Sequence, residues 1–153
     1  MNMPQGYVPL TLEHCDEYCR YLERTPRPTA DLTFTNLWGW APEYGLEWSE
    51  YAGLMWLRRT RRGDMPADRF WAPLGDWEHA DWDSILPHIP AGTVWDRVPE
   101  QLCAKLLALA PERVTIEETR AQWEYLYDQK ALASLSGNKL HKKKNHFNAY
   151  VKN

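Results

Sequence analysis

The side chains best suited to chemistry lie near the C-terminal end, in a segment rich in lysine and histidine. Seven candidate anion-binding residues follow Gly137, namely Lys139, His141, Lys142, Lys143, Lys144, Asn145 and His146. Three consecutive cations repel one another, so this run favours a nearby anion, such as a phosphate of RNA or of another phosphate-bearing ligand. The alternative is a solvated helix end, where the cations complement the C-terminal helix dipole.

The charge of the chain is divided unevenly along its length. The net charge is −3, but the last acidic residue is Asp128, and six lysines follow it. The remainder holds 12 basic and all 21 acidic residues, a balance of −9. An acidic body with a basic end predicts that the end contacts either this body or another anion.

The other reactive residue types favour structural roles. Cys15 and Cys19, beside His14, lack the second pair of ligands that a metal site needs. Cys103 lies on an apolar helix face with no histidine beside it to lower the pKa of its thiol. We therefore predict no metal and no cofactor, and we assign no catalytic residue. Three unpaired cysteines are typical of a reducing compartment.

Three charged clusters have ordinary explanations beside functional ones. An acidic loop offers cation ligands or helix caps: Asp76, Glu78, Asp81 and Asp83. A basic cluster offers an anion site or a solvated turn: Arg58, Arg59, Arg61 and Arg62. Glu117 and Glu118 offer a general base or a solvated strand end. For all three we favour the ordinary explanation.

Several familiar phosphate-binding and catalytic motifs are missing from the sequence. We find no Walker loop, no Gly-x-Gly-x-x-Gly and no Ser or Cys nucleophile elbow. None of the eight glycines matches the Arg/Gln-x-x-Gly-x-Gly/Ala turn that holds the acetyl-CoA pyrophosphate in GNAT acyltransferases. We therefore do not expect acetyl-CoA turnover by this chain.

Hydrophobic periodicity and turn residues predict the elements that position these side chains. A helix capped by Thr11 is expected to carry an apolar stripe of Leu12, Cys15, Cys19 and Leu22 and to end before Pro26 and Pro28. Further helices are expected over 36–40, from Asp81 or Asp83 through Leu86, after Pro99, over 130–135, and beyond a break at Ser136-Gly137. Strands are expected within 46–59 around an Ala52-Gly53 turn, and over 69–74, 93–98, 113–117 and 123–127. Interleaved strands and helices predict an α/β (α+β) domain with a mixed sheet.

Composition and the N-terminal sequence bear on location and on the core. Nine Trp and eight Tyr predict an aromatic core, or in part a flat surface that stacks a base or meets a second domain. The chain has no basic start followed by an apolar run, and no stretch of about 18 apolar residues. We therefore expect a cytoplasmic protein without a membrane span.

Six motifs occur in an order that resembles a known family. They are Leu32-Thr-Phe-Thr-Asn-Leu-Trp-Gly-Trp40, Pro73-Leu-Gly-Asp76, Val98-Pro-Glu100, Ile116-Glu-Glu118, Trp123-Glu-Tyr-Leu-Tyr127 and Leu132-Ala-Ser-Leu-Ser-Gly-Asn-Lys-Leu-His-Lys-Lys-Lys-Asn-His146. Together they make the chain similar, over essentially its whole length, to a bacterial family related to the C-terminal domain of phosphatidylglycerol lysyltransferase. The last motif is the most specific.

The resemblance implies a GNAT-like mixed sheet flanked by helices, in proteins that hold two such lobes in tandem. The chain resembles the first lobe, so 1–153 is expected to be a single lobe ending in a basic helix over 137–153. Relatives transfer an aminoacyl group from charged tRNA, which implies tRNA, a second lobe or a homo-oligomer as partner. Catalysis is not expected from this lobe alone. The alternative is a non-enzymatic module that binds RNA, another anion or a protein.

Overall fold

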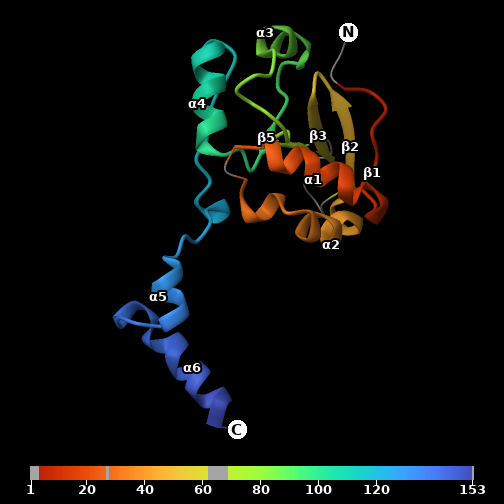
Figure 1. Ribbon diagram of the computed structural model, residues 1–153. Helices are drawn as coiled ribbons and strands as arrows, with labels where there is room; N and C mark the ends of the chain where they lie inside the picture. Colours follow the sequence, from red (N-terminus) through yellow and green to blue (C-terminus); the bar gives the residue numbers. More distant parts are fainter. Residues whose placement is uncertain (1–3, 27, 62–68, 153) are drawn as a thin grey trace. The chain divides into compact units, whose positions relative to one another are not determined.

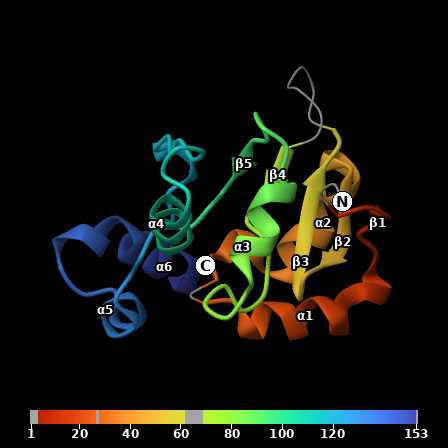
Figure 2. The same ribbon diagram turned by 90° about the horizontal axis from the view of Figure 1, so that it is seen from above.

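The computed structural model describes residues 4–26, 28–61 and 69–152 and divides them into two compact units, one up to Gln122 and one from Trp123. The first unit holds a five-stranded sheet in the order β1 (Val8–Pro9), β2 (Leu46–Tyr51), β3 (Leu54–Arg59), β4 (Arg69–Trp71) and β5 (Trp95–Asp96) (Figure 1, Figure 2). Neighbours are antiparallel except β4 and β5, which are parallel. This mixed sheet confirms the predicted α+β class and is consistent with a GNAT-like fold.

Four α-helices cover the two faces of this sheet. They are α1 (Cys15–Arg24), α2 (Phe34–Tyr44), α3 (Trp82–Ile85) and α4 (Glu100–Leu109). Met55 and Leu57 of β3 pack with α1 and α2, whereas Leu54 and Trp56 pack with α3 and α4. All four side chains are almost completely buried, because successive residues of a strand point to opposite faces. β3 is therefore the central strand of two hydrophobic cores.

The buried face of α1 differs from the predicted stripe. Tyr18 and Tyr21 are buried, whereas Cys15 and Cys19 are half-buried against the core and Leu12 is exposed. The tyrosines can occupy the core because the Tyr18 hydroxyl donates a hydrogen bond to the main-chain oxygen of Leu32, at 2.8 Å. A buried phenol needs such a partner, and periodicity of apolar residues alone does not reveal it.

The β2–β3 hairpin forms at the predicted Ala52-Gly53 turn. Both residues have positive φ, 52° and 74°, as a two-residue hairpin turn that matches the strand twist requires. A second glycine, Gly75, has φ 127° and donates its N–H to the buried Thr25 Oγ1 at 2.8 Å. This bond connects the loop before α3 to the end of α1.

Replacing Gly75 with alanine is expected to lower the free energy of unfolding by about 1–3 kcal/mol. An added Cβ would lie 2.9 Å from Leu54 Cδ2, in a backbone conformation that side chains rarely adopt. Denaturant unfolding measures the loss. Gly39→Ala is the matched control, since its Cβ meets nothing within 4 Å inside α2. A Gly75 variant as stable as the Gly39 variant would contradict this expectation.

The second unit consists of a non-helical stretch followed by two helices. The helices are α5 (Gln129–Ser134) and α6 (His141–Lys152), and a 3-10 turn, Asn138–Leu140, directly precedes α6. The Asp128 carboxylate caps α5 by accepting a hydrogen bond from the Ala131 N–H at 2.8 Å. Leu135 and Gly137 both have positive φ, so the predicted break between the helices is confirmed.

Two predicted strands are wrong. Residues 113–117 and 123–127 form no strand in the described chain. Their alternation of apolar and polar residues satisfies the strand pattern, but a strand also needs a neighbour for its main-chain hydrogen bonds. The described sheet ends at β1 and β5, and neither stretch pairs with it.

Candidate functional site

The basic segment spans the 3-10 turn and the first turns of α6. All seven candidate residues, Lys139, His141, Lys142, Lys143, Lys144, Asn145 and His146, are exposed, while Leu140 among them is buried. No carboxylate within the described ranges forms an ion pair with any of these lysines or histidines. The second unit holds six lysines against only Glu124 and Asp128, a balance of +4. The segment is therefore a strongly positive, solvent-facing surface.

The helix spreads the three consecutive lysines around its axis. With 3.6 residues per turn, Lys142 shares a face with His146, and Lys143 shares one with Phe147. Lys144 lies on a third face. Three such lysines cannot all contact a single phosphate. They are instead suited to a chain of phosphates that passes around the helix, or to separate contacts on its two sides.

Two tyrosines add an aromatic surface next to this charge. The rings of Tyr125 and Tyr127 stack with their centroids 6.3 Å apart and their planes at 23°. The Lys143 ammonium lies 5.8 Å from the Tyr127 ring centroid, within the range of a cation–π contact. Tyr125 is 87% exposed. Stacked aromatic faces beside cations are typical of surfaces that bind nucleotides.

The sequence alone does not connect these tyrosines with the lysines. The alternation of Trp123, Tyr125 and Tyr127 predicts a strand, which would orient the two tyrosine side chains to the same face without stacking them. Lys143 lies 16 residues from Tyr127 in the chain, and only the reversal through α5 and the Leu135–Gly137 break brings them together. The feature of the sequence that points to such a surface is its high Trp and Tyr content, which we interpret in part as a flat surface that stacks a base.

The large apolar side chains of α6 are exposed, whereas Leu140 in the turn before it is buried. Phe147 is 57% and Tyr150 83% exposed. A helix normally stabilises itself by burying such a face. These two rings therefore remain available on the described surface.

Two members of the arginine cluster, Arg58 and Arg59, are structural rather than part of a solvated turn. Arg58 and Arg59 end β3, and Arg58 pairs with Glu47 of β2 and lies over the Tyr7 ring. Arg59 is buried and pairs with Asp96 of β5 at 3.3 Å, while Arg69 pairs with the same carboxylate at 2.8 Å. Arg61 is exposed, and Arg62 lies outside the described residues. The ion pairs of Arg58, Arg59 and Arg69 hold the sheet together.

The acidic loop provides caps, as expected. Asp76 accepts hydrogen bonds from the main-chain N–H groups of Glu78 and His79, and Asp81 caps α3 through the Ser84 N–H. The hydrogen bond from the His79 side chain holds the pKa of Asp76 below its usual range. Glu117 and Glu118 are exposed in a non-strand segment. Neither set converges on a reaction centre.

The cysteines have unreactive surroundings. Burial raises the pKa of the Cys103 thiol, which is half-buried and lies 3.6 Å from the Val98 main-chain oxygen. Burial also raises the pKa of Cys19, and Cys15 adds to the shift. The thiolate is the nucleophilic form, so a raised pKa makes both residues poor nucleophiles. No cluster of three or more His, Cys, Asp or Glu that could hold a metal occurs in the described part of the chain.

Residues 22–153 match the family described as "Phosphatidylglycerol lysyltransferase, C-terminal". The chain belongs to this family. The match includes the basic segment, both stacked tyrosines and α4. A search of curated proteins finds no significant match. No helix among the described residues of this family member is long and apolar enough to cross a membrane.

A solved structure shares the fold of this lysyltransferase C-terminal family member. It is entitled "Crystal Structure of Conserved Protein of Unknown Function from Bacteroides thetaiotaomicron VPI-5482". The TM-score is 0.74 at 24% identity, over 97% of this chain and 50% of the other. The chain thus spans half the length of that protein.

Proposed function

We propose that the chain is one GNAT-like lobe of a protein related to aminoacyl- or acyltransferases, and that its basic segment binds the phosphates of tRNA or of another phosphate-bearing ligand. Family membership supports the first part, because the family takes its name from a lysyltransferase. The half-length match to a solved chain supports a role beside a second lobe or a second copy.

The observation that carries the second part is the arrangement around α6. Seven exposed polar residues, six of them Lys or His, lack carboxylate partners in the described structure, and Lys143 lies beside the stacked tyrosines. Phosphates would neutralise the lysines, and an unpaired base would stack on Tyr125. A merely solvated helix end would not require an aromatic stack next to its cations.

Two further observations support a lobe that does not catalyse a reaction alone. The thiols of Cys19 and Cys103 have raised pKa values, and the acidic groups of the loop before α3 serve as caps. The turn that holds acetyl-CoA in GNAT acyltransferases is also missing from the sequence. We therefore propose that this chain binds the ligand, and that aminoacyl or acyl transfer requires a second lobe or a second copy.

The chain is expected to bind tRNA with an affinity that falls steeply with salt. Three phosphate contacts on a duplex imply a slope of about −2.7 for log K against log salt, and a shallower one on single strands. Fluorescence anisotropy of labelled tRNA between low and physiological salt gives this slope. Binding that is independent of salt, or the absence of binding at low salt, would contradict the proposed phosphate site.

A protein-interaction module is the second candidate, favoured by the exposed apolar residues of the second unit. Tyr125, Leu126, Tyr150 and Val151 are 87%, 99%, 83% and 65% exposed. Such side chains are typical of surfaces that meet a partner. A stable dimer in analytical ultracentrifugation that persists at high salt, without tRNA binding, would favour this candidate over the phosphate site.

A further inference from the structure

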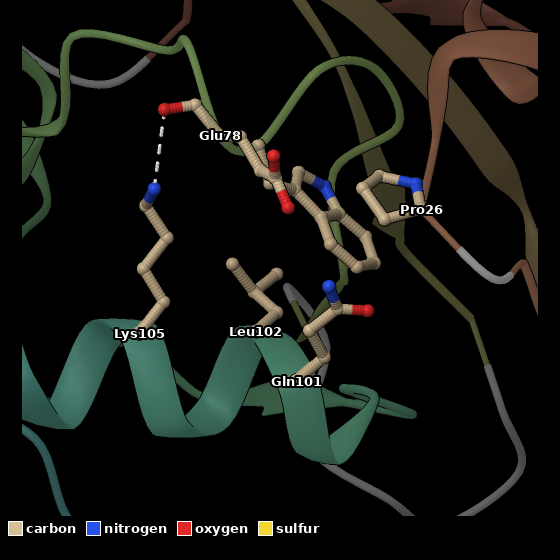
Figure 3. Close-up of a pocket in the computed structure, with 6 residues that line it drawn as sticks. Pro26, Glu78, Gln101, Leu102 and Lys105 are labelled. Carbon is tan, nitrogen blue, oxygen red and sulfur yellow. Dashed lines mark hydrogen bonds between the residues drawn. The ribbon is translucent and has the colours of Figure 1, made fainter.

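A hollow of about 360 Å³ lies in the first unit, between the loop before α3 and the start of α4. Its lining combines apolar and charged groups: Pro26, Trp77, Glu78, Gln101, Leu102 and Lys105. Figure 3 shows these side chains converging on one space from three segments of the chain. The volume lies at the lower end of the range of about 300–1,000 Å³ that is typical of small-molecule sites.

The two charged groups of the hollow are not paired with each other. Lys105 Nζ donates to the main-chain oxygen of Glu78 at 3.2 Å, and not to the Glu78 carboxylate. In Figure 3 this carboxylate is turned away from the ammonium, toward Leu102. No described residue forms an ion pair with either charge. The ammonium keeps two further N–H donors for a ligand.

The lining between these charges is apolar and well fixed. Leu102 is completely buried and Trp77 is 2% exposed. The Trp77 indole N–H donates to the Pro73 oxygen at 2.7 Å, which holds the ring in place. Gln101 adds an amide that can donate or accept a hydrogen bond. The hollow therefore has a rigid apolar lining with one negative and one positive group.

We propose that this hollow binds a small zwitterion, an α-amino acid with an aliphatic side chain. Its ammonium group pairs with the Glu78 carboxylate, and its carboxylate pairs with Lys105. Its side chain lies against the half-buried Pro26, over the buried Trp77 and Leu102. A simple amine would meet repulsion from Lys105, and a simple acid would meet repulsion from Glu78, so both opposite charges in one molecule are required.

Leucine should bind more tightly than either of its singly charged analogues, 3-methylbutylamine and 4-methylpentanoate. Chemical-shift titration of the ¹⁵N-labelled full chain measures all three affinities. Each missing charge should weaken binding by about threefold to tenfold, since both protein groups are partly hydrated. Equal affinity for the three compounds, no binding, or shifts confined to residues outside the hollow would overturn the proposal.

Two variants locate the charges within the same experiment. Glu78→Gln should reduce leucine affinity threefold to tenfold and leave 4-methylpentanoate binding unchanged or stronger. Lys105→Met should reduce leucine affinity without weakening 3-methylbutylamine. Asp83→Asn is the matched control, an exposed acid of the same region that does not line the hollow. An Asp83 variant that weakens leucine as much as the Glu78 variant would overturn the proposal, as would an unchanged Glu78 variant.

The site requires no phosphate, so its test is independent of the proposed function. Loss of tRNA binding with leucine binding intact would contradict only the phosphate site. A melting curve shows whether Lys105→Met folds. If it does not, the variant at the exposed Glu78 and the comparison of the three compounds on the unaltered chain still test the proposed amino-acid site.

Discussion

Replacing Asp96 with asparagine is expected to lower the free energy of unfolding of the chain by about 3 kcal/mol. The Asp96 carboxylate pairs with Arg59 at 3.3 Å and with Arg69 at 2.8 Å, and Arg59 is only 2% exposed. Removing the negative charge leaves a buried guanidinium without its carboxylate, and the cost of desolvating that cation remains. Urea unfolding followed by tryptophan fluorescence measures the change.

Glu47→Gln is the matched control for this experiment. Glu47 pairs with Arg58 on the same sheet, but about a quarter of its side chain is exposed, and hydrated pairs contribute about 0–1 kcal/mol. The double variant Asp96→Asn with Arg59→Met should recover part of the loss, because it removes the buried cation as well. An Asp96 variant that loses no more stability than the Glu47 variant would contradict this account.

The Asp96 ion pairs also affect the position of the hollow proposed above as an amino-acid site. β5 has only two residues and one neighbouring strand, so few main-chain hydrogen bonds hold it. Arg59 and Arg69 fix it to β3 and β4, and Arg97, directly after it, pairs with Asp31 and lies over the Trp71 ring. α4 begins at Glu100, three residues beyond Arg97, and carries Leu102 and Lys105. The ion pairs therefore help to place one wall of the hollow.

The elements that could be predicted from the sequence are those with local signals. The β2–β3 hairpin follows from Ala52-Gly53 between two apolar runs, and α4 follows from Pro99 and its leucines, although Pro99 is the N-cap rather than the first helical residue. β1 was missed because two residues form a strand only through pairing with β2. The predicted strand at Tyr125 and Tyr127 failed for the converse reason, a pattern without a partner.

The candidate sites also differ in whether the sequence alone reveals them. The basic segment could be found because six of its residues are consecutive. The hollow could not, because Glu78 and Lys105 are 27 residues apart, and each resembles an ordinary surface charge. Only the packing of Leu102 and Trp77 in one core cluster brings them together. Arg59 is the opposite case of a charge that is not an ordinary surface residue. It was predicted to lie in a solvated turn, but it is buried and pairs with Asp96, 37 positions away.

The triple variant Lys142→Gln, Lys143→Gln, Lys144→Gln is expected to lose most of the salt-dependent tRNA affinity of the chain. Each phosphate contact contributes about −0.9 to the slope of log K against log salt, so removing three should flatten it by up to about 2.7. Because the lysines lie on three faces of α6, single variants should differ. Lys143→Gln should also disturb the cation–π contact with Tyr127, which lies 5.8 Å from its ammonium.

The stability of the same variant separates two roles of the lysines. If they bind phosphate, unfolding should shift by less than about 0.5 kcal/mol, because all three side chains are exposed and glutamine is as good a helix former as lysine. If they instead dock on the acidic residues of the chain, the melting temperature should fall, and the loss should shrink in high salt. Lys130→Gln with Lys152→Gln is the matched control, with cations outside the 139–146 cluster. Unchanged tRNA binding together with a salt-sensitive loss of stability would rule out the phosphate site and assign the lysines to docking.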